Sequence, residues 1–81
     1  MNTVGLTDNF RQVISIYPNP TTGVVTITGA EGISRIYDIY GRLVLTTESN
    51  ELDLSTFADG IYFVHLIDNK GNLYVGRVLK E

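Results

Sequence analysis

Residues 60–80, which decide the fold, read GIYFVHLIDNKGNLYVGRVLK. Two apolar stretches, 61–68 and 73–80, are separated by the short polar segment Asn69-Lys70-Gly71-Asn72. A short connection of this kind joins antiparallel strands, and a glycine within it adopts a positive φ at no steric cost. We therefore predict a β-hairpin whose strands are residues 61–68 and 73–80.

The alternation within residues 61–68 assigns the two faces of this strand, since neighbouring side chains on a strand point to opposite sides. Tyr62, Val64 and Leu66 share one face, and we predict that Tyr62 and Val64 pack in the core. His65, the only histidine of the chain, lies on the opposite face. A lone histidine on a strand is usually a surface or half-buried residue, so we interpret His65 as structural rather than catalytic.

Five further short strands are predicted upstream of the hairpin, where the same alternation runs through residues 14–17, 25–28, 33–38, 42–47 and 52–54. The chain holds 25 β-branched residues and only two alanines, a balance that favours strands over helices. Residues 55–60 are predicted to form a single helical turn that Ser55 caps and Gly60 ends. About seven short strands at intervals of roughly 8–12 residues predict an all-β fold, a small immunoglobulin-like antiparallel β-sandwich.

Composition excludes several classes of protein. The chain has 81 residues, a net charge of −3, no cysteine and one histidine, which excludes disulfide frameworks, thiol catalysis, thiolate zinc sites and multi-histidine metal centres. Six dispersed basic residues on an acidic chain argue against nucleic acid as a partner, because phosphate binding needs a clustered positive face. No apolar run approaches the ~20 residues of a membrane-spanning helix, so we expect no transmembrane segment. We also expect no metal and no cofactor.

Catalysis finds no support in the pattern of residues. Ser15 and Ser55 have no partner that the sequence places beside them, so a Ser–His–Asp triad has no geometric basis. Residues 68–72 superficially echo a calcium-binding loop, but they lack its spaced carboxylates and terminal glutamate, and hairpin chemistry accounts for every residue. The five tyrosines fit a sugar-binding face, although sheet packing explains tyrosines on strands more often. The residues alone thus indicate a small β domain that is not an enzyme.

Four fragments of the sequence resemble one known family, the type A C-terminal sorting domains of the type IX (Por) secretion system. They are IYPNPT at 16–21 with Gly23 and Val25, IYD at 36–38 with GRLV at 41–44, LDLS at 52–55 with GIYFV at 60–64, and RVLK at 77–80. The resemblance spans about residues 13–80. The sorting-motif residues that it assigns are Pro18, Asn19, Pro20, Gly23, Asp38, Gly41, Val44, Gly60, Tyr62, Val64, Arg77, Val78, Leu79 and Lys80.

The resemblance implies a secretion signal at the C-terminus of a larger cargo protein of the Bacteroidota. Such a domain passes to the periplasm, where the outer-membrane translocon and its shuttle protein recognise it. A sortase-like cysteine endopeptidase then cleaves just before the domain, and the cargo reaches the cell surface or the medium. On this basis residues 1–12 are expected to be a linker or lead-in from the cargo, and residues 13–81 the sorting domain. The alternatives are an immunoglobulin-like accessory module that binds carbohydrate or protein, and a passive spacer.

Two segments are candidates for recognition. Prolines at positions 18 and 20 fix φ and restrict their neighbours, so they would hold Asn19 in one conformation for a receptor. The same segment would equally serve to end a strand and protect an edge from aggregation. Residues 76–80 are expected to form an exposed terminal edge strand, to which a receptor strand is added. Exposed edges also make an edge-strand dimer possible.

Overall fold

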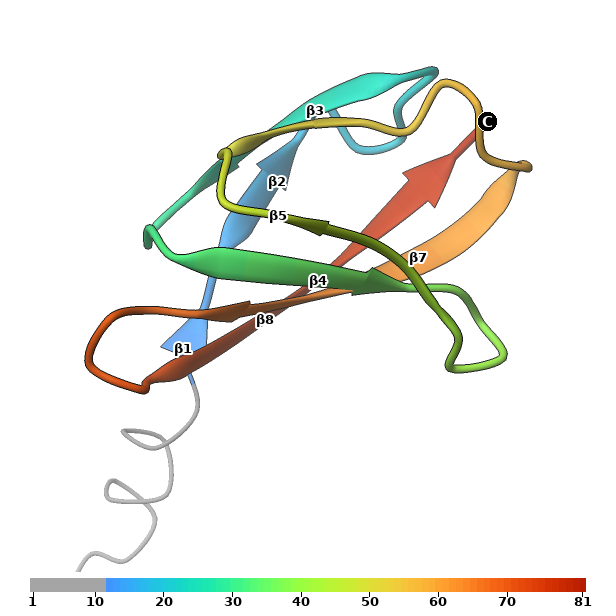
Figure 1. The fold of residues 1–81 in the computed structure, drawn as a ribbon. Coiled ribbons are helices and arrows are strands. Elements are labelled where there is room, and N and C mark those ends of the chain that lie inside the picture. The colour runs from blue at the N-terminus through green and yellow to red at the C-terminus, as the bar shows by residue number, and fades with distance from the viewer. Residues whose placement is uncertain (1–11) are drawn as a thin grey trace, which may run out of the picture.

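The predicted hairpin forms the centre of the larger of two β-sheets in the computed structural model, which describes residues 12–81 (Figure 1). Strands β7 (Gly60–Ile67) and β8 (Leu73–Lys80) pair antiparallel along their whole length. β4 (Ile33–Tyr37) pairs antiparallel with the other side of β7, and β5 (Leu43–Thr47) pairs with β4. β1 (Gln12–Val13) runs parallel to β8, so the order of this sheet is β1-β8-β7-β4-β5.

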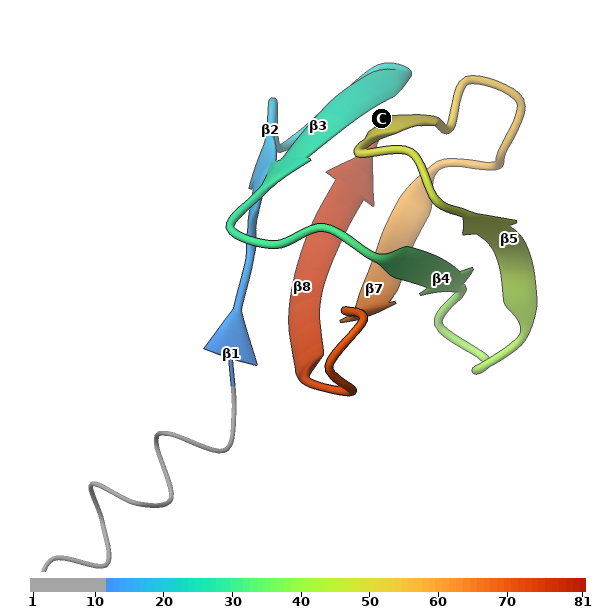
Figure 2. The same cartoon turned by 60° about the vertical axis from the view of Figure 1, so that its left-hand side comes forward.

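The smaller sheet consists of β2 (Ser15–Tyr17), β3 (Val24–Thr28) and β6 (Glu51–Asp53), paired antiparallel in the order β2-β3-β6. Only Ile14 separates β1 from β2, so the first strand is one extended segment divided between the two sheets. The two sheets face each other across the core (Figure 2). The prediction of a small all-β sandwich is confirmed, while the parallel pairing of β1 with β8 departs from the predicted antiparallel arrangement.

Inward-facing residues of both sheets form the core. Tyr62 and Val64 are exposed to only 6% and 0%, which confirms that they pack inside. His65 points outward, and its ring centroid lies 5.0 Å from that of Tyr37, so the prediction of a surface histidine is also confirmed. The other buried apolar residues of the core are Ile14, Ile16, Val25, Ile27, Ile36, Leu52, Leu54, Leu66 and Val78.

Residues 54–59 connect β6 to β7 without a helix, so the predicted helical turn capped by Ser55 was wrong. The Phe57 amide donates to the Leu54 carbonyl oxygen at 3.0 Å, which makes a turn that is not continued. The segment is too short to offset the cost of nucleating a helix. Gly60 has a φ of 148° and begins β7 instead of ending a helix.

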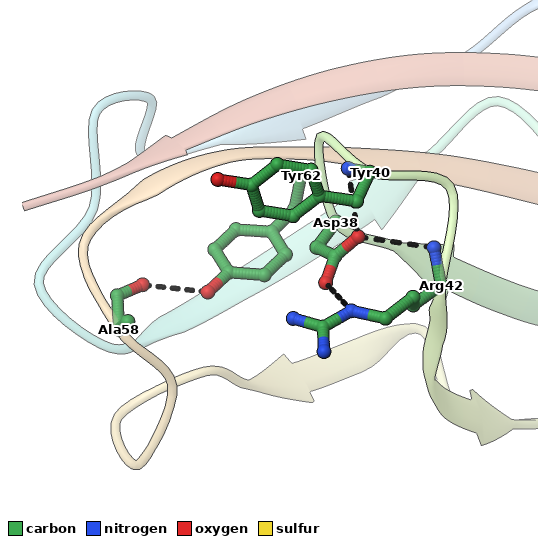
Figure 3. A network of polar contacts seen from close by, with 5 residues as sticks. All are labelled: Asp38, Tyr40, Arg42, Ala58 and Tyr62. Atoms are coloured by element: carbon green, nitrogen blue, oxygen red, sulfur yellow. Dashed lines mark hydrogen bonds and ion pairs between the residues drawn. The ribbon is translucent and has the colours of Figure 1, made fainter.

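A hydrogen bond from Tyr62 fixes this connection. The hydroxyl donates to the Ala58 carbonyl oxygen at 2.6 Å (Figure 3). The centroid of the tyrosine ring lies 5.6 Å from that of the Phe57 ring. Immunoglobulin-like sandwiches often carry a tyrosine at this place, near the start of the strand, with its hydroxyl bonded to the backbone a few residues upstream. The contact therefore supports the immunoglobulin-like prediction.

The predicted lead-in, residues 1–12, lies outside the described residues except for Gln12, which begins β1. Between residues 12 and 81, no helix has the length and apolar character needed to cross a membrane.

Candidate functional site

Many of the predicted sorting residues lie at one end of the sandwich, which we call the motif end. Because β7 runs antiparallel to both β4 and β8, those two strands finish where β7 begins. A parallel bridge between Thr21 and Lys80 brings the end of β8 to the connection that precedes β3. The segments that make up the motif end are residues 18–23, 38–42 and 54–60 with Lys80 and Glu81 (Figure 1).

The opposite end of the sandwich carries the other connections, residues 29–32, 48–50 and 68–72. Gln12, where the described chain begins, pairs with Tyr74 near the start of β8 and so lies toward this opposite end. The eight residues of β8 separate the two ends, a length of roughly 27 Å at ~3.4 Å per residue. The motif end is thus the end remote from Gln12, the first described residue.

Asn19 binds the outer edge of β8 through its side chain. Its Nδ2 donates to the Arg77 carbonyl oxygen at 2.8 Å, and its Oδ1 accepts from the Leu79 amide at 2.9 Å. The carboxamide thereby reproduces the donor and acceptor that a neighbouring strand would supply. The flanking residues Pro18 and Pro20 have no amide hydrogen and cannot themselves continue a ladder. The polar atoms of the Asn19 side chain thus face β8.

Thr21 continues the cover of β8 beyond Asn19. Its amide donates to the Leu79 carbonyl oxygen at 2.9 Å, and its own carbonyl accepts from the Glu81 amide at 2.8 Å. At the other end of the strand, the Ile14 amide donates to the Val75 carbonyl oxygen at 3.4 Å. The expectation that residues 76–80 present an exposed edge was therefore wrong, because the edge is occupied by residues brought from about sixty positions upstream. Residues 18–20, which we call the proline segment, thus protect an edge, and this alternative interpretation of the segment is supported.

Asp38 organises the turn between β4 and β5 (Figure 3). One carboxylate oxygen accepts from the amides of Tyr40 and Arg42 at 2.9 and 3.0 Å, and the other accepts from the Arg42 Nε at 2.8 Å. Burial raises the pKa of Asp38, but the hydrogen bonds from Arg42 and Tyr40 together outweigh it and lower the pKa below its ordinary value. Gly41 has a φ of 82°, which a side chain would strain. Asp38 and Gly41 thus act as a pair that closes this turn.

The turn between β7 and β8 has the same construction. Asp68 accepts from the amides of Lys70 and Asn72, each at 2.9 Å, and Gly71 has a φ of 86°. These hydrogen bonds, first among them the one from the Asn72 amide, lower the pKa of Asp68. The prediction of a hairpin turn at residues 68–72 is confirmed. In residues 12–81 no group of three or more histidine, aspartate or glutamate side chains is placed to hold a metal ion.

Lys80 joins the last strand to the connection before β7. Its ammonium lies 3.2 Å from an Asp59 carboxylate oxygen, and only 11% of the lysine side chain is exposed. Gly23 directly precedes β3 of the smaller sheet and also lies at the motif end. Its carbonyl oxygen accepts from the Leu54 amide at 3.0 Å. A Cβ at Gly23 would lie 3.4 Å from the Ser55 Cβ, so the two segments pack closely.

The remaining predicted sorting residues do not gather at the motif end as a surface. Val64 and Val78 are fully buried in the core, and Val44 is half-buried against it. Arg77 and Leu79 point outward from β8. Thr21 and Asp59, which are partners of the last strand, were not predicted from the sequence. Thr21 is 3% exposed, and its hydroxyl accepts from the Gly23 amide at 3.0 Å, but a threonine after a proline gives no distinctive signal.

Secretion system C-terminal sorting domains form the family that matches this chain, over residues 15–81. No curated protein matches the chain. The matched residues include every predicted sorting residue and seven of the eight strands, β2 to β8. A domain of this family acts as a signal and not as a catalyst, and it directs export across the outer membrane to the cell surface or the medium. The chain therefore belongs to the family of secretion system C-terminal sorting domains, the export signals of the type IX system.

Proposed function

We propose that this chain is the address of a cargo protein that the outer-membrane translocon of the type IX system and its shuttle protein bind in the periplasm. A sortase-like cysteine endopeptidase then cuts the chain upstream of β1 and releases the cargo. The whole domain is in this view a substrate of the export machinery. The family match carries the proposal, since it covers both sheets of the sandwich.

The arrangement of the two ends supports this order of events. Gln12, the first described residue, lies toward the end of the sandwich opposite to the motif end, and in this proposal the cargo precedes it in the chain. The motif end, where Asn19 is exposed and the buried Asp38 and Lys80 hold the turns in place, is therefore the end that the cargo would leave accessible. The endopeptidase would approach from the cargo side while the machinery holds the folded domain.

The motif residues support the role through folding as well as through exposure. Asn19, Asp38 and Lys80 each fix a turn or an edge by hydrogen bonds or an ion pair. A signal that is read as a folded shape must keep that shape without disulfides, and these contacts stabilise the segments that connect the strands. We propose that the motif residues act first by holding the motif end in one conformation. The family match does not support the alternative of a carbohydrate- or protein-binding accessory module.

The test follows the fate of a periplasmically exported fluorescent protein fused to the N-terminus of residues 1–81. In a host with an intact type IX system, we expect the fluorescent protein outside the outer membrane, and intact-mass measurement should show that the domain has been removed. When the endopeptidase is disrupted, the fusion should stay uncleaved and keep its full size. A fusion that stays uncleaved in the intact host would contradict the proposed processing, and one retained in the periplasm would contradict the proposed role as an address.

A further inference from the structure

The outer face of the larger sheet is unusually apolar for a two-layer sandwich. The outward residues of β7 include Ile61, Phe63 and Ile67, each exposed to between 37% and 39%. The outward side of an antiparallel sandwich sheet is usually polar, since only the inward side meets the core. β7 is instead apolar on both sides, a pattern typical of strands that are covered on both faces.

Neighbouring strands extend this surface. In register across β4, β7 and β8 lie the rows Ile33–Ile67–Leu73, Arg35–His65–Val75 and Tyr37–Phe63–Arg77, and Ile61 lies opposite Leu79. We call these eleven residues the sheet face. Directly paired side chains on one face of a sheet lie within contact distance, so the eight apolar members gather on this face around Arg35 and His65. Patches of this kind on soluble domains mark sites of interaction.

The charges on the sheet face have one sign. Arg35 and Arg77 are its permanently charged members, and neither forms an ion pair with a carboxylate among residues 12–81. Of the other three cations in residues 12–81, Arg42 and Lys80 are paired with Asp38 and Asp59, and Lys70 lies in the turn between β7 and β8, off the sheet face. The chain as a whole is acidic, with a net charge of −3. The two arginines without ion-pair partners therefore make the sheet face positive on a chain that is negative overall.

The outer face of the smaller sheet has the opposite character. Its outward residues are mostly threonine, serine and acidic residues, with Glu51 and Asp53 contributed by β6. Tyr17 and Val24 are its large apolar members. Exposure of apolar side chains is therefore concentrated on one of the two sheets, and small size alone does not account for it.

The sheet face also meets the motif end. One hollow is lined by Tyr37, Ile39, Phe63 and His65 beside the Asp38 turn. A second is lined by Asn19, Pro20, Ile61, Arg77 and Leu79. Two predicted sorting residues, Arg77 and Leu79, thus belong to the sheet face and border the proline segment.

From these observations we infer that the sheet face is the surface by which the domain docks onto a protein of the export machinery. The inference rests on the proposed function and names its recognition surface. The partner surface is apolar and bears carboxylates, because these complement the apolar rows and the two unpaired arginines. A second copy of this chain is a poorer occupant, since stacking two sheet faces about a two-fold axis brings arginines toward arginines.

The test uses the fluorescent fusion and pairs of variants on the two outer faces. Arg77→Glu reverses a charge on the sheet face, Arg77→Lys preserves it, and Glu51→Arg is the matched reversal on the smaller sheet. Ile61→Thr with Leu79→Thr removes apolar surface, and Tyr17→Thr with Val24→Thr is its control. Threonine is chosen because it keeps the strand propensity. Thermal unfolding of each isolated variant chain checks that the variant is folded. The delivered fraction is then compared only between folded proteins.

We expect the delivered fraction to fall about tenfold for Arg77→Glu and for the sheet-face threonine pair, equivalent to a loss of ~1.4 kcal/mol in binding. Both controls on the smaller sheet should stay within about twofold of the parent fusion, below ~0.5 kcal/mol, and Arg77→Lys, which keeps the charge, should be delivered better than Arg77→Glu. Equal delivery of all variants, with the parent fusion delivered normally, would overturn the docking inference alone. Failure of the parent fusion itself would instead overturn the proposed function.

A photoreactive residue placed at Ile61, and separately at Thr26 on the smaller sheet, identifies the occupant. Adducts from position 61 to a component of the type IX machinery, with none from position 26, support the inference. Adducts from position 61 to a second copy of the chain, or to the fluorescent cargo, would overturn it, as would the absence of any adduct at that position.

Discussion

Replacement of Asn19 by alanine tests the side-chain contact by which Asn19 covers the edge of β8 at the motif end. The substitution removes a donor to the Arg77 carbonyl oxygen at 2.8 Å and an acceptor from the Leu79 amide at 2.9 Å. Both contacts lie at the surface, so water can hydrate the two released backbone groups. Two hydrogen bonds with a net value of ~0.5–1 kcal/mol each predict a loss of about 1–2 kcal/mol in the free energy of unfolding.

A loss of this size lowers the melting temperature by roughly 4–16 °C, since a domain of this length shifts by ~4–8 °C for each kcal/mol. Urea unfolding measures the free energy, and amide hydrogen exchange measures protection at Leu79 directly. We expect Asn19→Ala to increase exchange at Leu79 while exchange at Val64, deep in β7, changes only with the global stability.

Asn69→Ala is the matched control, because it removes the same side chain from the exposed turn between β7 and β8. Its effect on the free energy of unfolding should stay within ~0.5 kcal/mol. If Asn19→Ala behaved like Asn69→Ala in both unfolding and Leu79 exchange, the account of Asn19 as a cover for the β8 edge would be refuted.

Three further predictions concern the core and the turns. Ser34 is fully buried and its hydroxyl has no hydrogen-bond partner among the described residues, so Ser34→Ala should raise the free energy of unfolding by about 1 kcal/mol in urea titrations. A decrease would contradict the assignment of a buried hydroxyl without a partner. Tyr62→Phe removes the 2.6 Å bond to the Ala58 carbonyl and should cost about 1–2 kcal/mol by the same measurement, whereas Tyr40→Phe at an exposed ring should be nearly neutral. The pKa values of Asp38 and Asp68 are lowered on folding, so their contribution to stability is present above their unfolded pKa of ~3.9 and is lost as the pH falls through the folded values. In the Asp38→Asn, Asp68→Asn double variant, the free energy of unfolding should therefore fall less steeply between pH 5 and pH 2 than in the parent chain. An unchanged slope would disprove the assignment.

Local patterns were enough to predict much of the fold. The period-two alternation in residues 61–68 and 73–80 and the glycine at position 71 define the β7–β8 hairpin without any distant contact. The faces of β7 were harder to assign, because both are apolar. Tyr62 and Val64 turned inward as predicted, and the apolar surplus on the other side became visible as the sheet face only once both neighbouring strands were placed.

The contacts that the sequence did not reveal are those between distant segments. Asn19 and Leu79 are sixty residues apart, and nothing local indicates that the carboxamide of one meets the amide of the other. The expectation of an exposed last strand failed for that reason. The helical turn at residues 55–60 failed for a different one, since a capping serine and a later glycine also suit a connection that the Tyr62 hydroxyl holds in place.

The sorting-motif residues also divide into those whose role a local pattern could predict and those whose role depends on a distant segment. Asp38 with Gly41 is a turn that could have been recognised, because Asp68 and Gly71 stand at the same spacing in the hairpin that was predicted. The pairing of Lys80 with Asp59 could not be predicted, since it depends on the course of the connection between the two sheets.

The most direct test of the central claim is the fraction of a fluorescent protein fused to residues 1–81 that lies outside the outer membrane in otherwise identical hosts with and without a working type IX system. The account predicts delivery in the competent host and retention in the periplasm of the deficient host. Equal delivery in both hosts, or retention in both, would contradict the claim that this sandwich is an export signal of the type IX system.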